Sequence, residues 1–489
     1  MKNWKNLALA AALLSMPVLA QPNAKAQSNP NISAQNPYAG SVQAVPATPG
    51  VRQLSLDEAI RLGIEHNLAL TLSHLNQKTA QAQKLQLENY LLPNLSLHGE
   101  VGVHQYNLEA EGFRHQLLAD FGIPPSEASE FPLVVVVNSQ IGQLNLSQAL
   151  FTWSGWDLWR AAKANERAAY YSAQSSRGLV VLYVGSAYLK AIASSAQIDY
   201  AQSLLKTDQT LLYQAQQAHL AGTAANLDEL RARVQYQTQQ QALITAQNNF
   251  EKDKIALNRQ IGLAPGQQIQ LTDATPYSDL AALTIEDARQ QAYKNRQDYQ
   301  GLKQQILFAE LEQRAVKHER YPSLSFNGNY GVTGVTGGVY HGTFAAAGTL
   351  NIPVFHEAKF RGDRDVASAQ VDELRSQMND LTSKIDQQLR DSMLDLQSAH
   401  ELVRVSKSNV DLATTALDQS AERFKAGVDD NLPVAEAQST LAQAQVQYVN
   451  SVYQYNQAKL GLARNLGIID IQYKNYIPSG NTPPPTNIQ

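Results

Sequence analysis

The sequence predicts a protein of two repeats, each built from long α-helices and a pair of membrane-crossing β-strands. Three observations carry this prediction. Residues 363–426 contain neither Gly nor Pro, and a continuous helix of that length would be about 96 Å long, deeper than a compact domain. Short motifs recur along the chain at nearly constant offsets. Runs of about 10 residues alternate between apolar and polar side chains, the length that a tilted strand needs to cross a bilayer.

The composition excludes several classes of protein. The chain has 489 residues with a net charge of −4, and only 17% of its residues are charged. It therefore has no basic face for nucleic acid, and we expect no nucleic-acid partner. The absence of Cys rules out disulfides, thiolate zinc sites and thiol nucleophiles. The 10 His follow no metal-ligand spacing, so we expect no metal, no cofactor and no enzymatic activity.

The N-terminus has the pattern of a secretory signal peptide. Lys2 and Lys5 precede the apolar residues 7–14, and small residues follow at Ala20 and Ala26. We predict a signal peptide over residues 1–20, with cleavage after Ala26 as the alternative. The apolar run is far shorter than the roughly 20 residues of a membrane-spanning helix, so we expect export without a transmembrane helix. Residues 21–54 are rich in Pro, Asn, Ala, Ser and Gln, which predicts a disordered N-terminal segment.

The long Gly- and Pro-free stretch also indicates how its helix packs. Apolar residues recur at steps of three and four, namely Val371, Leu374, Met378, Leu381, Ile385, and again Val410, Ala413, Leu417, Ala421 and Phe424. Steps that average about 3.5 residues favour helices that supercoil left-handedly, rather than a helix on a globular core. The pattern by itself also fits a solvent-exposed dimeric coiled coil.

The chain contains two copies of one unit. At an offset of 229, residues 55–59 match residues 284–288, and residues 93–97 match residues 322–326. Further matches have offsets of 204 or 205: residues 150–151 with 354–355, 221–222 with 426–427, 226–227 with 431–432, and 261–262 with 466–467. The repeats therefore cover residues 55–262 and 284–467. Residues 263–283 are predicted to be a non-helical linker, and residues 468–489 an extended or disordered C-terminal tail.

Each repeat is predicted to have the order helix, strand hairpin, long helix and returning helix. A cap at Ser55 or Thr284, with an acid three residues later, opens a helix of about 35 residues that ends at Pro93 or Pro322. The long helix of the first repeat is predicted over residues 156–220.

The strands alternate apolar and polar residues, and one of them is irregular. Apolar positions include Leu95, Leu97, Val101, Val103 in the first hairpin and Leu324, Phe326, Tyr330, Val332 in the second. Ile141 and Leu144 have opposite parity, which predicts a bulge. The first hairpin has a long loop at residues 107–137, whereas the second turns at residues 334–338. A sheet facing lipid must close on itself, and four strands are too few, so either two copies (8 strands) or three (12 strands) must join.

Several motifs resemble a known family. They are PNLSL at residues 93–97, PSLSF at 322–326, LNIPVF at 350–355, RFKAG at 423–427 and AEAQ at 435–438. Together, residues 55–467 resemble the TolC-like outer-membrane efflux protein family. The resemblance implies a homotrimer whose 12-strand transmembrane barrel in the outer membrane continues into a periplasmic α-helical tube. It also implies a periplasmic adaptor and an inner-membrane transporter as partners, and contact with outer-membrane lipid.

The same resemblance implies a functional site at the two helix turns. Gly222 and Thr223 mark the first turn, and Gly427 and Val428 the second. Gly at these positions predicts a left-handed residue that ends the preceding helix, and we expect both turns to contact the adaptor. Candidate residues for the closed periplasmic entrance are Asp228, Asp429, Asp430 and Glu436. Three copies of each would form acidic rings that favour cations, although Pro433 stands where the family often has an acid.

Two functions follow from these features. The first is a passive exit channel of a tripartite efflux or type I secretion system; the second is a structural coiled-coil tether across the envelope. A tether requires long helices but no membrane-length alternating strands, so the strands favour the channel. A wide water-filled tube selects little, so the transporter partner is expected to choose the cargo.

Overall fold

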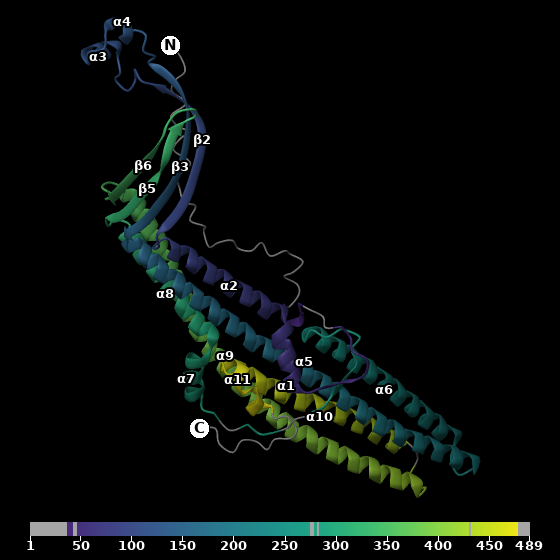
Figure 1. The fold of residues 1–489 in the computed structure, drawn as a ribbon. Helices are drawn as coiled ribbons and strands as arrows, with labels where there is room; N and C mark the ends of the chain where they lie inside the picture. Colours follow the sequence, from purple (N-terminus) through teal and green to yellow (C-terminus); the bar gives the residue numbers. More distant parts are fainter. Residues whose placement is uncertain (1–36, 43–45, 274–277, 281–282, 430–431, 478–489) are drawn as a thin grey trace, which may run out of the picture.

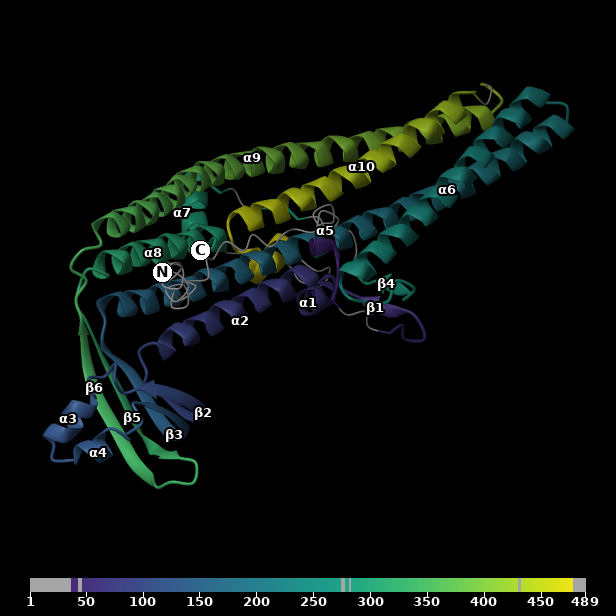
Figure 2. The same cartoon turned by 90° about the horizontal axis from the view of Figure 1, so that it is seen from above.

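The computed structural model describes residues 37–42, 46–273, 278–280, 283–429 and 432–477. Long helices run side by side through most of its length, and a sheet projects from one end of them (Figures 1 and 2). The helix turns between α5 and α6 and between α9 and α10 lie at the opposite end.

The two repeats have the same order of elements. The first contains α1 (Leu56–His66), α2 (Leu68–Asn89), β2 (Asn94–Asn107), β3 (Val134–Phe151), α5 (Trp153–Leu220) and α6 (Asn226–Gln260). The second contains α7 (Ile285–Asn295), α8 (Gln297–His318), β5 (Ser323–Val335), β6 (Tyr340–Asn351), α9 (Glu357–Lys425) and α10 (Leu432–Asn465). The long helices have 68 and 69 residues. The predicted order of helix, hairpin, long helix and returning helix is confirmed.

The predicted 35-residue helix that opens each repeat was wrong, because it is two helices. α1 and α2 join at Asn67, and α7 and α8 at Arg296, both with extended backbone (ψ of 133° and 119°). These two residues are equivalent in the repeats, since they too differ by 229 positions. Asn67 caps α2 by accepting from the Ala69 N–H at 2.9 Å, and its amide donates to the Tyr38 carbonyl at 2.8 Å. Buried side-chain hydrogen bonds of Asn67 thus break the first of these helices without Gly or Pro.

One antiparallel sheet contains both hairpins, in the order β2-β3-β5-β6. Its register places Leu97, Leu144, Tyr330 and Phe344 side by side in one row across all four strands. The neighbouring row on the other face is His98, Gln143, Gly331 and Thr343. One face of the sheet is therefore largely apolar and the other largely polar, as the alternation predicts.

The predicted bulge exists, but at a different place. Pairing of β3 with β2 and β5 is continuous through Ile141 and Leu144, and the register shifts at Leu150, between Ala149 and Phe151. The long loop of the first hairpin carries two short helices that the sequence did not predict, α3 (His115–Asp120) and α4 (Pro125–Ala128). The second hairpin turns between Val335 and Tyr340, as predicted.

A central core joins the two repeats midway along the helices. Its buried residues come from helices of both repeats, among them α1, α5, α6, α7, α9 and α10, and include Val184, Tyr188, Leu257, Leu389 and Leu460. Gly63 of α1 lies so close to α5 that a Cβ there would be 2.7 Å from Val184 Cγ2. Both long helices thus share one packed layer with the short helices around them.

Segments predicted to be irregular contribute to this core. Residues Arg52–Leu54, expected to be disordered, form β1 and pair in parallel with β4 (Ile269–Leu271) of the predicted linker. In the expected tail, residues Ile469–Tyr476 form α11, which buries Ile469 and Tyr476. For residues 52–54 and 469–476 these predictions were wrong, because composition does not reveal burial against a distant partner. A short 3₁₀-helix, η1 (Pro37–Ala39), precedes β1. The predicted signal peptide lies outside the described residues.

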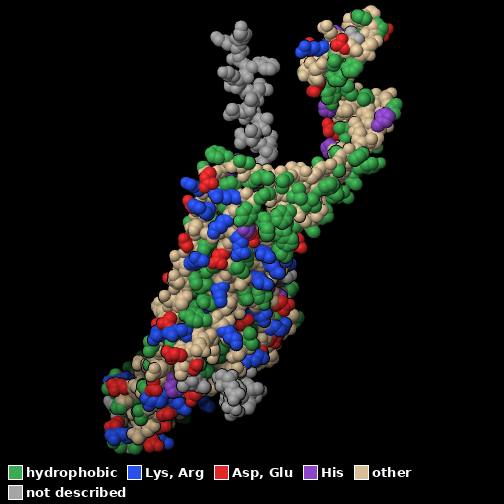
Figure 3. All heavy atoms as spheres, turned by 90° about the vertical axis from the view of Figure 1, so that its left-hand side faces the viewer, with side chains coloured by type: hydrophobic (Ala, Val, Ile, Leu, Met, Phe, Trp, Pro, Cys, Tyr) green, Lys and Arg blue, Asp and Glu red, His purple; other side chains and the backbone are tan. Residues whose placement is uncertain are grey.

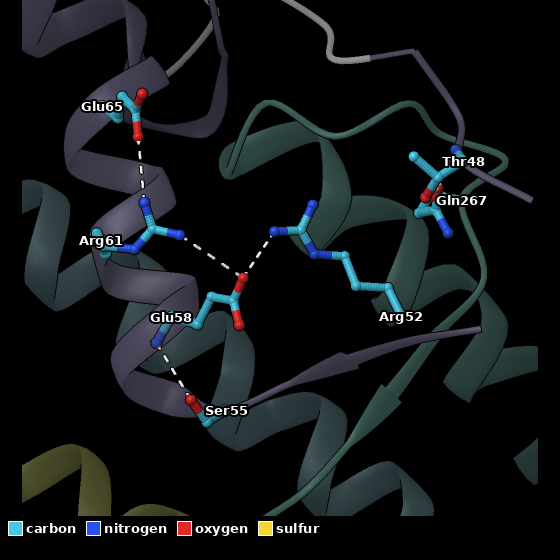
Figure 4. A network of polar contacts seen from close by, with 7 residues as sticks. All are labelled: Thr48, Arg52, Ser55, Glu58, Arg61, Glu65 and Gln267. Carbon is cyan, nitrogen blue, oxygen red and sulfur yellow. Dashed lines mark hydrogen bonds and ion pairs between the residues drawn. The ribbon is translucent and has the colours of Figure 1, made fainter. Parts of the chain in front are cut away.

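Polar contacts fix the start of α1 beside β1 (Figure 4). Ser55 caps the helix by accepting from the Glu58 N–H at 3.3 Å. The Glu58 carboxylate binds Arg52 of β1 at 2.6 Å and Arg61 of α1 at 3.6 Å. The predicted Ser55 cap is confirmed, and Thr284 caps α7 in the same way.

Part of α5 is apolar enough to cross a membrane by length and composition. An 18-residue window in it has a mean hydropathy of 1.5, and 56% of that window is buried. α5 supplies Val180, Val181, Val184 and Tyr188 to the central core. Burial inside the protein explains its apolar composition.

Candidate functional site

The two helix turns opposite the sheet have one geometry. Gly222 has φ +73° and Gly427 has φ +71°. The Thr223 N–H donates to the Ala218 carbonyl at 2.9 Å, and the Val428 N–H to the Arg423 carbonyl at 3.0 Å, both across six residues. This is the Schellman motif, which satisfies the last carbonyls of a helix. The predicted left-handed glycines are confirmed, and the turns are tight.

The acids after the first turn are paired with arginines of their own helix. Asp228 lies 3.7 Å from Arg231, and Glu229 lies 2.7 Å from Arg233. Both carboxylates lie in the first turn of α6, where the partial positive charge of the helix N-terminus favours them. Asp228 is thus placed at the turn as predicted, with a basic side chain beside it.

The second turn is also a mixture of charges. The Arg423 Nε donates to Asp429 Oδ2 at 2.6 Å, and this bond lowers the pKa of Asp429 and raises that of Arg423. Glu436 is exposed on α10, whereas Asp430 lies outside the described residues. Figure 3 shows acidic and basic side chains intermixed at this end of the molecule. The acidic rings stay a prediction, and within the single chain Asp429 is already paired with Arg423.

Two helical hairpins, α5 with α6 and α9 with α10, pack against each other. Sequence reasoning missed a buried acid between them. Asp208 of α5 is 2% exposed, and its seam neighbours Leu204 and Leu211 pack in an apolar cluster with residues of α9 and α10. The heptad spacing of α5 could have revealed it, because Asp208 occupies an otherwise apolar seam position.

The sheet forms the other end of the candidate site. Its apolar row is open to the surroundings, with 82% of Leu97 and 79% of Phe344 exposed. Hydrophobic side chains gather along the sheet in Figure 3. Within the single chain β2 and β6 are edge strands, each paired on one side. Within the single chain, both the apolar face and the two strand edges are therefore left open.

In the described part of the chain, no group of three or more His, Asp or Glu side chains is placed to hold a metal ion.

Comparisons with known proteins agree with this geometry. A model of the outer membrane efflux protein family matches residues 59–263 and 288–468. The probable efflux pump outer membrane protein SepC of Pseudomonas putida is 24% identical over 63% of this chain, and the match covers 65% of SepC, less than two thirds of its length. The pyoverdine export outer membrane protein OpmQ of Pseudomonas aeruginosa is 22% identical over 84% of this chain and 85% of its own length.

A solved structure shares the fold. The outer membrane protein VceC of Vibrio cholerae aligns with a TM-score of 0.70 and 17% identity, over 84% of this chain and 96% of VceC.

Proposed function

The chain belongs to the outer membrane efflux protein family, and on that premise we propose that it is the outer-membrane exit channel of a tripartite efflux or secretion system. It conducts cargo passively from the periplasm to the exterior. The observation that carries the proposal is the four-stranded sheet, with one apolar face, one polar face and two open edges, at the end of helices 68 and 69 residues long.

The open edges favour assembly. An unpaired strand edge in hydrocarbon leaves backbone groups unsatisfied at a cost of several kcal/mol each. We expect β6 of one copy to pair with β2 of the next, and three copies to close a barrel of 12 strands. The polar face, which carries Asn145, Asn329 and Thr343, then lines a water-filled lumen.

The helix turns are the expected docking surface for a periplasmic adaptor, which links the channel to an inner-membrane transporter. Thr223 and Val428 are exposed at the tips, and the Schellman motifs hold Gly222 and Gly427 in a defined shape. Photo-cross-linking residues placed at Thr223 and Val428 should capture the adaptor. Capture only from positions near the sheet would contradict this docking mode.

Asp228, Asp429, Asp430 and Glu436 are the proposed lining of the closed entrance. In a trimer each acid occurs three times around one narrow opening, where low-dielectric walls focus the field. The pairing of Asp429 with Arg423 at 2.6 Å reduces the net charge of that ring. We therefore expect modest cation selectivity and weak binding of divalent ions.

Planar-bilayer recording tests this proposal. The double variant Asp429→Asn with Asp430→Asn should lower cation selectivity and weaken block by divalent ions, with a smaller effect on resting conductance. The matched control is Asp372→Asn with Asp380→Asn, which removes the same charge from exposed positions of α9 far from the turn. If the tip variant keeps the parent's selectivity and divalent block, Asp429 and Asp430 do not line the entrance. If the trimer inserts without ever conducting, the channel itself is contradicted.

A further inference from the structure

Asp208 stands at a seam position where the two helical hairpins meet. The buried residues of this part of α5 recur at steps of three and four: Ala201, Leu204, Asp208, Leu211 and Ala215. Leu204 and Leu211 pack in one apolar cluster with Ala413 and Leu417 of α9 and Val434 of α10. A carboxylic acid therefore occupies a position that the surrounding pattern reserves for an apolar side chain.

The surroundings of Asp208 offer no charge to balance it. A cavity of about 10 Å³ beside it is lined by Leu211 of α5, by Ala232 and Gln235 of α6, and by Ala435 and Gln438 of α10. None of these residues is charged. The cavity is at the lower limit for a single water. Neither carboxylate oxygen has a hydrogen-bond partner among the described residues, and the same holds for the Gln438 Nε2 that faces the cavity.

Burial without a partner disfavours the ionised carboxylate. Desolvation raises the pKa of Asp208 to about 7, and the nearby Gln438 amide, which does not meet hydrogen-bond geometry with Asp208, partly opposes this rise. The NH₂ group of Gln438 can donate to the ionised Asp208 carboxylate. With the amide flipped, the Gln438 side-chain oxygen can accept from the protonated carboxyl group. The carboxyl group is therefore able to bind a proton in the pH range in which a periplasmic protein works.

The second repeat shows that the acid is not required by the fold. The residue 205 positions later, at the offset that relates the long helices, is Ala413, which is buried in the same cluster. An apolar side chain thus occupies the equivalent position in α9. Asp208 costs packing energy that its counterpart does not, which calls for a role other than packing.

We propose that Asp208 is a proton-binding site between α5, α6 and α10, and that proton binding there controls how tightly the two helical hairpins pack. The proton binds to a carboxylate oxygen and is released to solvent when α10 separates from α5. Acidification then locks the hairpins together, and a rise in pH loosens them near the proposed entrance.

Linkage between proton binding and packing sets the direction of the pH effect. In the packed state the Asp208 pKa is about 7, and in a solvated, separated state it returns toward the usual value of about 3.9. The packed state therefore binds the proton more strongly. The protonated carboxyl group favours packing fully below about pH 4. Between about pH 4 and about pH 7 the equilibrium constant for packing falls by up to about tenfold per pH unit, and above about pH 7 it no longer changes.

Hydrogen exchange measures this packing in the assembled protein. After correction for intrinsic chemical exchange, amide protection of residues 434–445 should fall by more than about tenfold from about pH 5 to about pH 8. Asp208→Asn, which mimics the protonated acid, should keep high protection at both pH values. Asp208→Ala, which copies Ala413, should also remove the pH response. The control Asp411→Asn, at an exposed position of α9, should respond to pH like the parent.

Two results would overturn the proposal. One is a parental pH response that survives in Asp208→Asn. The other comes from infrared spectroscopy of the parent protein, which is informative even if the Asp208→Asn variant does not fold. The band of the protonated Asp208 carboxyl group, assigned by isotope labelling or by its loss in Asp208→Ala, should disappear as the pH rises through neutrality. A carboxyl group already fully ionised at about pH 5 would exclude the site.

The proton site itself does not depend on the proposed function, whereas its effect on conduction does. If exchange and infrared data show the titration but bilayer conductance is the same at both pH values, the proton site stands and its link to the entrance fails. If no conductance is seen at all, the proposed function fails independently of Asp208.

Discussion

The central core and the sheet differ in how much of their structure a single chain completes. The core buries Leu54, Tyr188, Leu257 and Leu389 completely, using elements from both repeats. In the sheet, every residue of β6 is exposed. The core is thus completed by residues of its own chain, whereas the sheet has an exposed apolar face and two edge strands that are each paired on one side only.

This difference separates two sources of stability. Apolar burial within the core stabilises the chain before any assembly. If the proposed assembly is right, the sheet gains comparable stability only from lipid and from the strand edges of neighbouring copies. We therefore expect substitutions in the core to affect every state of the protein, and substitutions in the sheet to act on the inserted, assembled state.

The largest effect is expected at Gly467, where α10 ends against the junction of α7 and α8. Its φ is +77°, and an added Cβ would lie 2.6 Å from the Arg296 backbone N. Gly467→Ala combines left-handed strain with overlap against backbone, which together should cost roughly 2–5 kcal/mol of unfolding free energy. Denaturant unfolding measures this loss.

Gly427 provides the matched control. It has nearly the same φ, +71°, but nothing lies within 4 Å of an added Cβ. Gly427→Ala should therefore cost only the strain of roughly 1–2 kcal/mol. Equal losses of unfolding free energy in the two variants would show that the backbone at Arg296 moves away from the added Cβ at little cost. That result would contradict a rigid central core.

An intermediate effect is expected on the apolar face of the sheet. Leu97→Arg puts a charge on the proposed lipid-facing side, at a cost of about 2–4 kcal/mol near the membrane centre. His98→Arg puts the same charge on the polar face and should cost little. The measurement is unfolding free energy in lipid vesicles; similar losses for both variants would mean that the two faces are not lipid and lumen.

A smaller effect is expected at Tyr188 in the core. Its hydroxyl oxygen lies 2.7 Å from Asp273 Oδ2 and 3.0 Å from the Leu54 carbonyl oxygen. Tyr188→Phe leaves these acceptors with fewer donors, and should cost about 1–3 kcal/mol. Because the Leu56 N–H also donates to Asp273 at 2.8 Å, the fold should survive; complete unfolding in this variant would contradict our description of the core.

Much of this architecture could be predicted from the sequence because its signals are local or periodic. The constant offsets revealed the repeats, the absence of Pro revealed the long helices, and alternation assigned Leu97 and Tyr330 to one face of the sheet. Gly222 and Gly427 could be predicted as left-handed because turn geometry favours Gly.

The parts that could not be predicted depend on contacts between distant segments. The break at Asn67 requires the Tyr38 carbonyl, and β1 requires β4 more than 200 residues later. α11 forms where Ile469 and Tyr476 reach the core. The pairing of Asp429 with Arg423, six residues earlier, needed the shape of the turn.

Our central claim is that copies of the chain complete the sheet that one chain leaves open. Native mass spectrometry of the protein extracted in mild detergent tests it most directly. We predict a complex of three chains, each of at most 53.7 kDa, and no stable smaller species. A monomer would contradict closure between copies, and a dimer would contradict the barrel of 12 strands.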